Sequence, residues 1–157
     1  MGSKFQREDF LMSKVSDVLN EKGNAVLAME SSSTVFEAIK VIADAKIGAL
    51  LVKDGENVVG VFSERDFLVR CGVAGLDPKK VKIKDVMTSK IICADPEMSV
   101  EECLAIMSEK QIRHLPVMKG KNLVGIISII DLVKWVSKNQ EVHIQYLTDY
   151  ISGKYPA

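Results

Sequence analysis

Two short stretches of the chain end an apolar run with a serine and place an aspartate three residues later. These motifs are Ser63–Asp66 and Ser128–Asp131. A serine followed at this spacing by an acid caps the first turn of a helix. The same turn can present N–H groups and a hydroxyl to an anion, and its carboxylate can accept hydrogen bonds from the vicinal hydroxyls of a ribose. The spacing therefore leaves two interpretations open, a helix cap and a ligand site.

A basic residue accompanies each motif, although from a different place in each. Arg65 lies between the serine and the aspartate of the first motif, whereas Arg113 and His114 stand at the head of an apolar run before the second. One arginine for each motif suits a phosphate, because the planar guanidinium fork matches the oxygens of the anion. The simpler alternative is that Arg65 and Arg113 are solvated surface residues. If they bind phosphate, their different origins predict two unequal sites.

The motifs occur twice because the surrounding sequence is duplicated. A shift of 65 positions aligns residues 23–70 with residues 88–135 without a gap. Identical pairs recur along this alignment, among them Val35 and Val100, Asn57 and Asn122, and Gly60 and Gly125. A shorter echo precedes each copy at a shift of 68, Lys14–Leu19 against Lys82–Met87. The chain is therefore a tandem repeat of one supersecondary unit.

Each copy has the pattern β-α-β-β-α. A Ser/Thr-x-x-Glu capping box begins the first helix, whose apolar residues recur at i, i+3, i+4 and i+7. A hairpin with a glycine in its turn follows, and the Ser-x-x-Asp motif begins the second helix. The other predicted elements are the opening strands Ala25–Met29 and Ile91–Cys93, the hairpins Ile47–Val52 with Val58–Phe62 and Ile112–Val117 with Leu123–Ile127, and the last helices Glu64–Arg70 and Ile129–Ser137.

This pattern predicts a mixed α/β protein of the α+β class. A unit of about 50 residues buries too little surface to be stable alone, so we expect the two repeats to pack sheet to sheet with pseudo-twofold symmetry. The predicted segments are an N-terminal tail at 1–13, repeats at 14–72 and 82–137, a linker at 73–81, and a C-terminal amphipathic helix and tail at 138–157.

Histidines and cysteines form no catalytic or metal-binding constellation in the sequence. His114 and His143 have no acid, cysteine or second histidine at ligand or triad spacing, and Cys71, Cys93 and Cys103 are too far apart for a metal knuckle. No phosphate-binding glycine motif occurs either. We therefore expect no metal and no enzymatic activity. Three cysteines, an odd number, favour a reducing cytoplasm over an oxidising compartment.

The composition argues against nucleic-acid and membrane partners. Among 157 residues, 21 Lys and Arg balance 21 Asp and Glu, so no net charge attracts a phosphate backbone or an anionic membrane. Aromatic residues make up only 6%, which leaves few platforms for stacking bases. The longest apolar run, Leu123–Ile130, is too short to cross a bilayer.

With these motifs in order, the sequence resembles a tandem pair of cystathionine-β-synthase (CBS) domains, also called a Bateman module. The resemblance rests on "VGVFSERDFLVR", "DVMT", "RHLPV" and "LVGIISIIDLVKW", and it covers about residues 14–137. Since no enzyme domain accompanies the pair, the chain looks like a stand-alone two-CBS protein. The resemblance implies regulatory binding of adenosine-containing ligands, namely AMP, ADP, ATP, NAD(H) or S-adenosylmethionine, and a homodimer.

The resemblance also implies roles for individual residues. Asp66 and Asp131 would hold ribose hydroxyls, with Ser63 and Ser128 beside them. The implied phosphate contacts are Arg65, Arg113 and His114. The implied adenine slot is formed by Ile47, Gly48, Ala49, Leu115 and Pro116; among these, Gly48 and Ala49 leave room for a flat group near the strand backbone. Similar proteins commonly have glycine where this chain has Ile130, which predicts a different shape for the second site.

We therefore expect a non-catalytic regulatory module that binds AMP or a related ligand in clefts between the repeats and acts as an energy or metabolite sensor. The alternative is a structural or protein-interaction module whose clefts are vestigial and empty.

Overall fold

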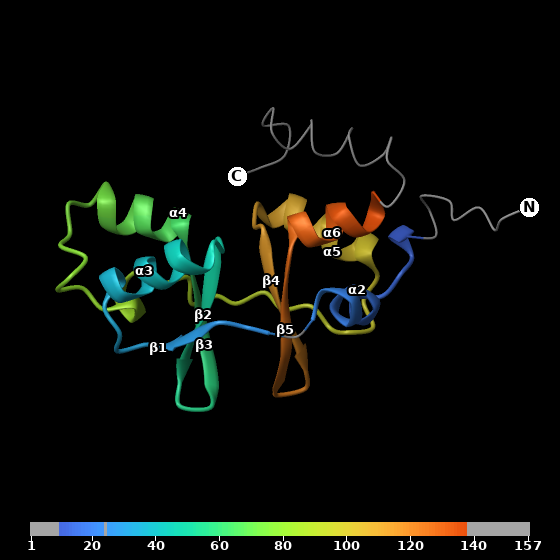
Figure 1. Cartoon of the computed structure of the whole chain (residues 1–157), viewed down its shortest axis with the longest axis horizontal. Coiled ribbons are helices and arrows are strands. Elements are labelled where there is room, and N and C mark those ends of the chain that lie inside the picture. Colours follow the sequence, from blue (N-terminus) through green and yellow to red (C-terminus); the bar gives the residue numbers. More distant parts are fainter. Residues whose placement is uncertain (1–9, 24, 138–157) are drawn as a thin grey trace, which may run out of the picture. The chain divides into compact units, whose positions relative to one another are not determined.

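The computed structural model describes residues 10–23 and 25–137. Short strands alternate with helices along it (Figure 1), which confirms the predicted α+β class. The chain divides into two compact units. The first-copy unit is residues 25–91, and the second-copy unit combines residues up to 24 with residues from 92 onward. The predicted C-terminal helix lies outside the described residues.

The first-copy unit is a three-stranded sheet with helices. Strand β1 (Ala28–Glu30) pairs in parallel with β2 (Ala49–Asp54), and β2 pairs antiparallel with β3 (Asn57–Ser63). Helix α3 (Val35–Ala45) begins at the Thr34 cap and buries its apolar stripe in a core that contains Leu50, Val52 and Phe62. Helix α4 (Glu64–Asp66) begins directly after β3.

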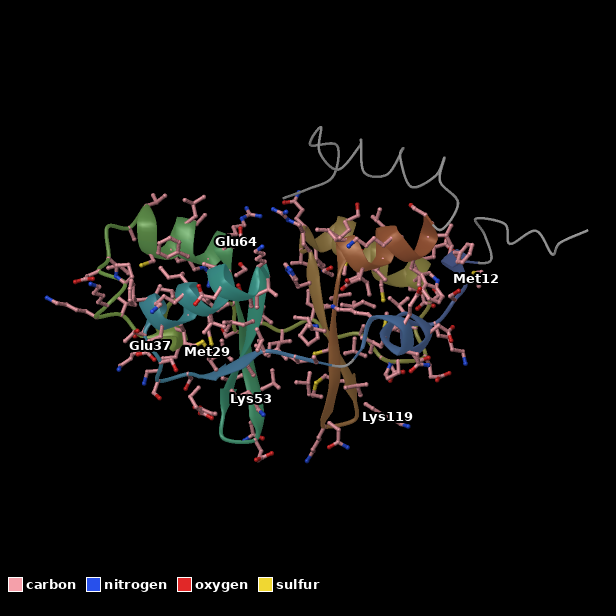
Figure 2. All side chains as sticks on the ribbon, in the orientation of Figure 1. Met12, Met29, Glu37, Lys53, Glu64 and Lys119 are labelled. Atoms are coloured by element: carbon pink, nitrogen blue, oxygen red, sulfur yellow. The ribbon has the colours of Figure 1, made fainter. Side chains whose placement is uncertain are left out.

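The second-copy unit repeats the hairpin and its helices. Helix α5 (Val100–Lys110) begins at the Ser99 cap, and β4 (His114–Lys119) pairs antiparallel with β5 (Asn122–Ser128). Helix α6 (Ile129–Val136) follows β5 directly. In each copy the lysine near the end of the first hairpin strand, Lys53 or Lys119, lies toward the turn (Figure 2).

The opening strand of the second copy differs from the prediction at Ile91–Cys93. That stretch forms no strand, and only Ala94 bridges to Val117 in parallel. In the first copy, the N–H group of Ser31 donates to the carbonyl oxygen of Lys53 at 2.9 Å and lengthens the ladder. The residue that corresponds to Ser31 is Pro96. At the other end of the ladder, the N–H group of Leu51 donates to the carbonyl oxygen of Leu27 at 3.0 Å, and the residue that corresponds to Leu51 is Pro116. Neither proline has an N–H group to donate. The second ladder therefore ends after a single bridge.

The helix predicted at Glu64–Arg70 is also different. After the three residues of α4 the chain continues as a π-helix at Phe67–Gly72, whereas α6 in the second copy is a regular α-helix. π-Helical turns are rare and wide. The two copies therefore diverge immediately after the Ser-x-x-Asp motif.

The opening segment of each repeat packs with the other copy. Helix α2 (Val15–Lys22) opens the first repeat, but its buried Val15, Val18 and Leu19 belong to the core of the second-copy unit. The short 3₁₀ helix Ile83–Asp85 opens the second repeat, but Ile83 lies in the core of the first-copy unit. The segment boundaries inferred from the repeats stay predictions, because sequence repeats and packing units need not coincide.

Candidate functional site

The serine and aspartate of the first motif cap α4 reciprocally. The N–H group of Asp66 donates to Ser63 Oγ at 3.2 Å, while the N–H group of Ser63 donates to Asp66 Oδ2 at 3.0 Å. The chain turns here from β3 into α4, so the capping interpretation is correct for this copy. The turn also fixes the position of the Asp66 carboxylate, and the residue as a whole is 7% exposed.

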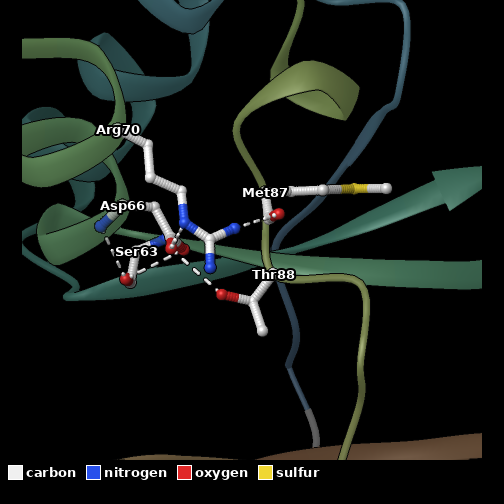
Figure 3. A network of polar contacts seen from close by, with 5 residues as sticks. All are labelled: Ser63, Asp66, Arg70, Met87 and Thr88. Carbon is white, nitrogen blue, oxygen red and sulfur yellow. Dashed lines mark hydrogen bonds and ion pairs between the residues drawn. The ribbon is translucent and has the colours of Figure 1, made fainter. Parts of the chain in front are cut away.

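The carboxylate of Asp66 has further partners from the segment before the second repeat (Figure 3). Thr88 Oγ1 donates to Asp66 Oδ1 at 3.0 Å, and Ser63 Oγ donates to Oδ2 at 3.1 Å. Arg70 Nε lies 3.8 Å from Oδ1, and Arg70 Nη1 donates to the carbonyl oxygen of Met87 at 2.7 Å. We call Ser63, Asp66, Arg70 and Thr88 the first cluster. Both oxygens of its carboxylate are engaged.

The second motif caps α6 with similar geometry. The N–H group of Asp131 donates to Ser128 Oγ at 3.1 Å, and the N–H group of Ser128 donates to Asp131 Oδ2 at 2.8 Å. The additional partner is different, because Lys22 Nζ at the end of α2 donates to Asp131 Oδ2 at 2.5 Å and to the carbonyl oxygen of Ile126 at 2.8 Å. The Asp131 side chain is 20% exposed, more than that of Asp66 at 9%.

His114 lies close to this carboxylate. It is the first residue of β4 and pairs with Ser128 across the hairpin. Burial, together with the smaller effects of the positive charges of Arg113 and Lys22, lowers the pKa of His114 to about 4, and the negative charge of Asp131 opposes this shift. The imidazole is therefore neutral at pH 7. We call Lys22, His114, Ser128 and Asp131 the second cluster.

Arg113 directly precedes His114 of the second cluster, and its backbone carbonyl accepts a hydrogen bond from the start of α6. The N–H group of Ile129, the first residue of α6, donates to the carbonyl oxygen of Arg113 at 2.8 Å. The corresponding bond in the first copy runs from the N–H group of Glu64 to the carbonyl oxygen of Gly48 at 3.1 Å. Arg65 is exposed in the first turn of α4, and Ile130 is 41% exposed in the first turn of α6.

The residues of the expected adenine slot lie on the first hairpin strand of each copy or just before it. Ile47 and Gly48 are half-buried ahead of β2, and Ala49, which is buried, pairs with Ser63. In the second copy Leu115 and Pro116 are both buried in β4, and Leu115 is part of the core. The motif serine and these residues are therefore neighbours within each hairpin.

Sequence reasoning missed Arg70, Thr88 and Lys22. Lys22 and Thr88 lie just beyond the echoed segments Lys14–Leu19 and Lys82–Met87. Continuing the shift of 68 places Asn20 opposite Thr88 and Lys22 opposite Lys90. The similarity of the two echoed segments was the sequence signal that could have pointed to Lys22 and Thr88, but it does not indicate on which copy each segment packs.

Residues 10–23 and 25–137 offer neither a metal-binding cluster nor a membrane-spanning helix. No group of three or more His, Cys, Asp or Glu residues in these ranges could hold a metal ion. No helix in them is long and apolar enough to cross a membrane. Burial raises the pKa of the Cys103 thiol to about 11, with Glu102 adding to the effect, so this thiol is a poor nucleophile.

Comparison with known proteins gives one consistent result. The family model described as "CBS domain" matches residues 15–71 and 83–138. The chain is 34% identical over 162 residues to the CBS domain-containing protein CBSX3, mitochondrial, of Arabidopsis thaliana, covering 98% of this chain and 79% of that protein. A putative signal-transduction protein with CBS domains from Burkholderia ambifaria has a solved structure with a TM-score of 0.79 and 37% identity, covering 82% of this chain and 96% of that one.

A further solved structure is that of Hypoxic Response Protein I with two coordinated zinc ions. It is 27% identical to this chain with a TM-score of 0.67, and the match covers 78% of this chain and 98% of that one.

Proposed function

Because this chain belongs to the CBS-domain family and carries two of its domains in tandem, we propose that it is a regulatory module for an adenosine-containing ligand. Tandem CBS modules are generally regulatory and ligand-binding, and stand-alone members are generally regulatory rather than catalytic. We propose AMP as the preferred ligand, with ADP, ATP, NAD(H) and S-adenosylmethionine as the related compounds to compare. The module would act as a cytoplasmic energy or metabolite sensor and as a homodimer.

The observation that carries this proposal is the chemistry around Asp131. A helix cap needs only the serine and the carboxylate, yet Lys22 Nζ also donates to Asp131 Oδ2, and Arg113 directly precedes His114 at the start of β4. A partly exposed carboxylate can accept hydrogen bonds from two ribose hydroxyls, and the neighbouring cations suit a phosphate. The arrangement therefore fits the two ends of a ribose phosphate.

Each sequence-predicted residue has a role in this proposal. The ribose hydroxyls donate to Asp131 in the second copy and to Asp66 in the first, beside Ser128 and Ser63. The phosphate contacts are Arg113 and His114 in the second copy and Arg65 in the first. The adenine lies against Ile47, Gly48 and Ala49 in the first copy and against Leu115 and Pro116 in the second.

The first test measures the melting temperature with AMP, ADP, ATP, NADH or S-adenosylmethionine at millimolar concentration, followed by calorimetric titration. We expect AMP to raise the melting temperature. Asp131→Asn should weaken binding at least tenfold, because two charge-assisted hydrogen bonds of about 1.5–3 kcal/mol each become neutral ones. Asp66→Asn should have the smaller effect, because both oxygens of Asp66 already accept hydrogen bonds.

The matched control is Glu102→Gln. Glu102 completes the capping box at the start of α5, where Ser99 Oγ donates to its carboxylate at 3.2 Å, and it lies outside both clusters. Its substitution should leave ligand affinity unchanged. If none of the adenosine compounds shifts the melting temperature of the wild type, the sensor proposal fails and a protein-interaction module becomes the better explanation.

A further inference from the structure

Lys22 is held at the second cluster by the packing of its helix. Leu19, one turn earlier in α2, is buried and so close to β5 that a Cβ atom added at Gly125 would lie 3.0 Å from Leu19 Cδ2. The end of α2 is therefore anchored beside β5. Lys22 ends this helix, where a cation also interacts favourably with the helix dipole.

The ammonium group of Lys22 has two acceptors at this position. It donates to Asp131 Oδ2 and to the carbonyl oxygen of Ile126, at 2.5 and 2.8 Å. Among the described residues, none donates a hydrogen bond to Asp131 Oδ1. The Lys22 side chain is 31% exposed, so solutes can reach it. Because an ammonium has three N–H donors, Lys22 can keep the carbonyl of Ile126 while it exchanges Asp131 for another anion.

The first cluster has no such ammonium group. There the partners of Asp66 are hydroxyls, one N–H group and the guanidinium of Arg70, and Arg70 is also bound to the carbonyl oxygen of Met87. Lys90 corresponds to Lys22 at the shift of 68, but it is exposed in the first-copy unit. Among the described residues, an ammonium group bound to the motif carboxylate is thus found only in the second cluster.

We propose that Lys22 selects phosphorylated ligands at the second cluster. In the free chain its ammonium group neutralises Asp131; when ribose hydroxyls donate to Asp131, the ammonium group turns to the phosphate of the same ligand. This inference rests on the proposed function, because it assigns Lys22 a role at the same site. His114 is neutral at pH 7, so the positive charge in the second cluster comes from Lys22.

The test compares AMP with adenosine by calorimetric titration of the full chain. Lys22→Met keeps the apolar stem and removes the charge, and it should weaken AMP binding about tenfold, the value of one charge-assisted hydrogen bond. Adenosine should bind Lys22→Met as well as the wild type or better, because the ammonium no longer competes for Asp131. The preference for AMP over adenosine should therefore fall, and Lys22→Arg should restore much of it.

Lys90→Met is the matched control, since it removes the lysine that corresponds to Lys22 at the shift of 68. Its preference for AMP should equal that of the wild type. If Lys22→Met weakens AMP and adenosine equally, or if Lys90→Met has the same effect, Lys22 does not select phosphate, although the proposed function stands. If the wild type binds neither compound, the proposed function fails and this inference fails with it.

Discussion

Asp66 and Asp131 are the same residue in the same motif, but their surroundings differ. Both cap a helix through a serine three residues earlier. Thr88 and Arg70 complete the partners of Asp66, whereas the ammonium of Lys22 is the added partner of Asp131. The side chain of Thr88 is short and has few rotamers, so its hydroxyl stays beside Asp66. The long side chain of Lys22 has more rotamers and can turn from Asp131 to another acceptor. At the scale of the residue, the capping turn is common to both copies and the exchangeable partner is not.

The half-buried imidazole of His114 predicts a pH dependence of stability. Its pKa is lowered from 6.5 to about 4 in the folded chain, so on acidification the unfolded chain takes up this proton first. Stability is therefore complete above pH 6.5 and is lost as the pH falls towards 4. The loss at pH 4.5 should be on the order of 2–3 kcal/mol. It can be measured by urea denaturation at pH 7 and pH 4.5.

His114→Gln provides the comparison, because glutamine takes up no proton in either state. The groups facing His114 are Arg113, Asp131 and Lys22, and all three remain in this variant. It should therefore lose less stability than the wild type between pH 7 and pH 4.5, while the protonation of carboxylates lowers the stability of both proteins equally. An equal loss in the two proteins would show that His114 does not cause the dependence.

At the scale of the element, each β-hairpin is closely approached by the opening segment of the other repeat. The corresponding glycines Gly60 and Gly125 permit this approach. A Cβ atom at Gly60 would overlap Met87 Sδ and lie 2.9 Å from the carbonyl oxygen of Thr88, whereas at Gly125 the nearest atom is Leu19 Cδ2 at 3.0 Å. The first contact includes backbone and the second only the end of a side chain, so the two glycines are not equally replaceable.

We therefore predict that Gly60→Ala destabilises the protein more than Gly125→Ala. Overpacking against the backbone at Thr88 should cost about 1–3 kcal/mol. At Gly125 the leucine can shift, and the reduced freedom of the unfolded chain offsets the remainder by about 0.4–1 kcal/mol. Urea denaturation of the two variants measures both values. Equal losses would mean that the segment at Met87 and Thr88 yields as readily as Leu19 does.

At the scale of the whole molecule, the two compact units do not follow the order of the repeats. Leu19 lies near the start of the first repeat and is buried with the second copy, while Ile83 lies near the start of the second repeat and is buried with the first. Each unit is therefore completed by the opening segment of the repeat that does not supply its hairpin. Neither copy could be cut out at the repeat boundaries without losing part of its core.

This arrangement predicts crossed effects of two core substitutions. Leu19→Ala and Ile83→Ala each remove a buried side chain and should cost about 2–5 kcal/mol. In hydrogen exchange, Leu19→Ala should reduce protection most in β4, β5 and α6, and Ile83→Ala most in β2 and β3. If each substitution instead acted mainly on the hairpin of its own repeat, the assignment of the two segments would be wrong.

Local sequence determined much of this protein. Helix caps, apolar stripes and hairpin turns depend on residues a few positions apart, so the two repeats, their hairpins and both Ser-x-x-Asp turns were predictable. Two local features were still missed. The second opening strand is reduced to a single bridge because Pro96 and Pro116 lack N–H groups, and the last helix of the first copy continues as a π-helix.

The tertiary structure decided the partners of the two carboxylates. Lys22 and Asp131 are 109 positions apart, and Thr88 reaches Asp66 from 22 positions away. The echoed sequences at the start of the repeats show that these segments are related but not which copy each one covers. That depends on the fit of buried side chains such as Leu19 and Ile83 into one core or the other, which no local pattern encodes. The sequence thus determined the two motifs, and packing made them unequal.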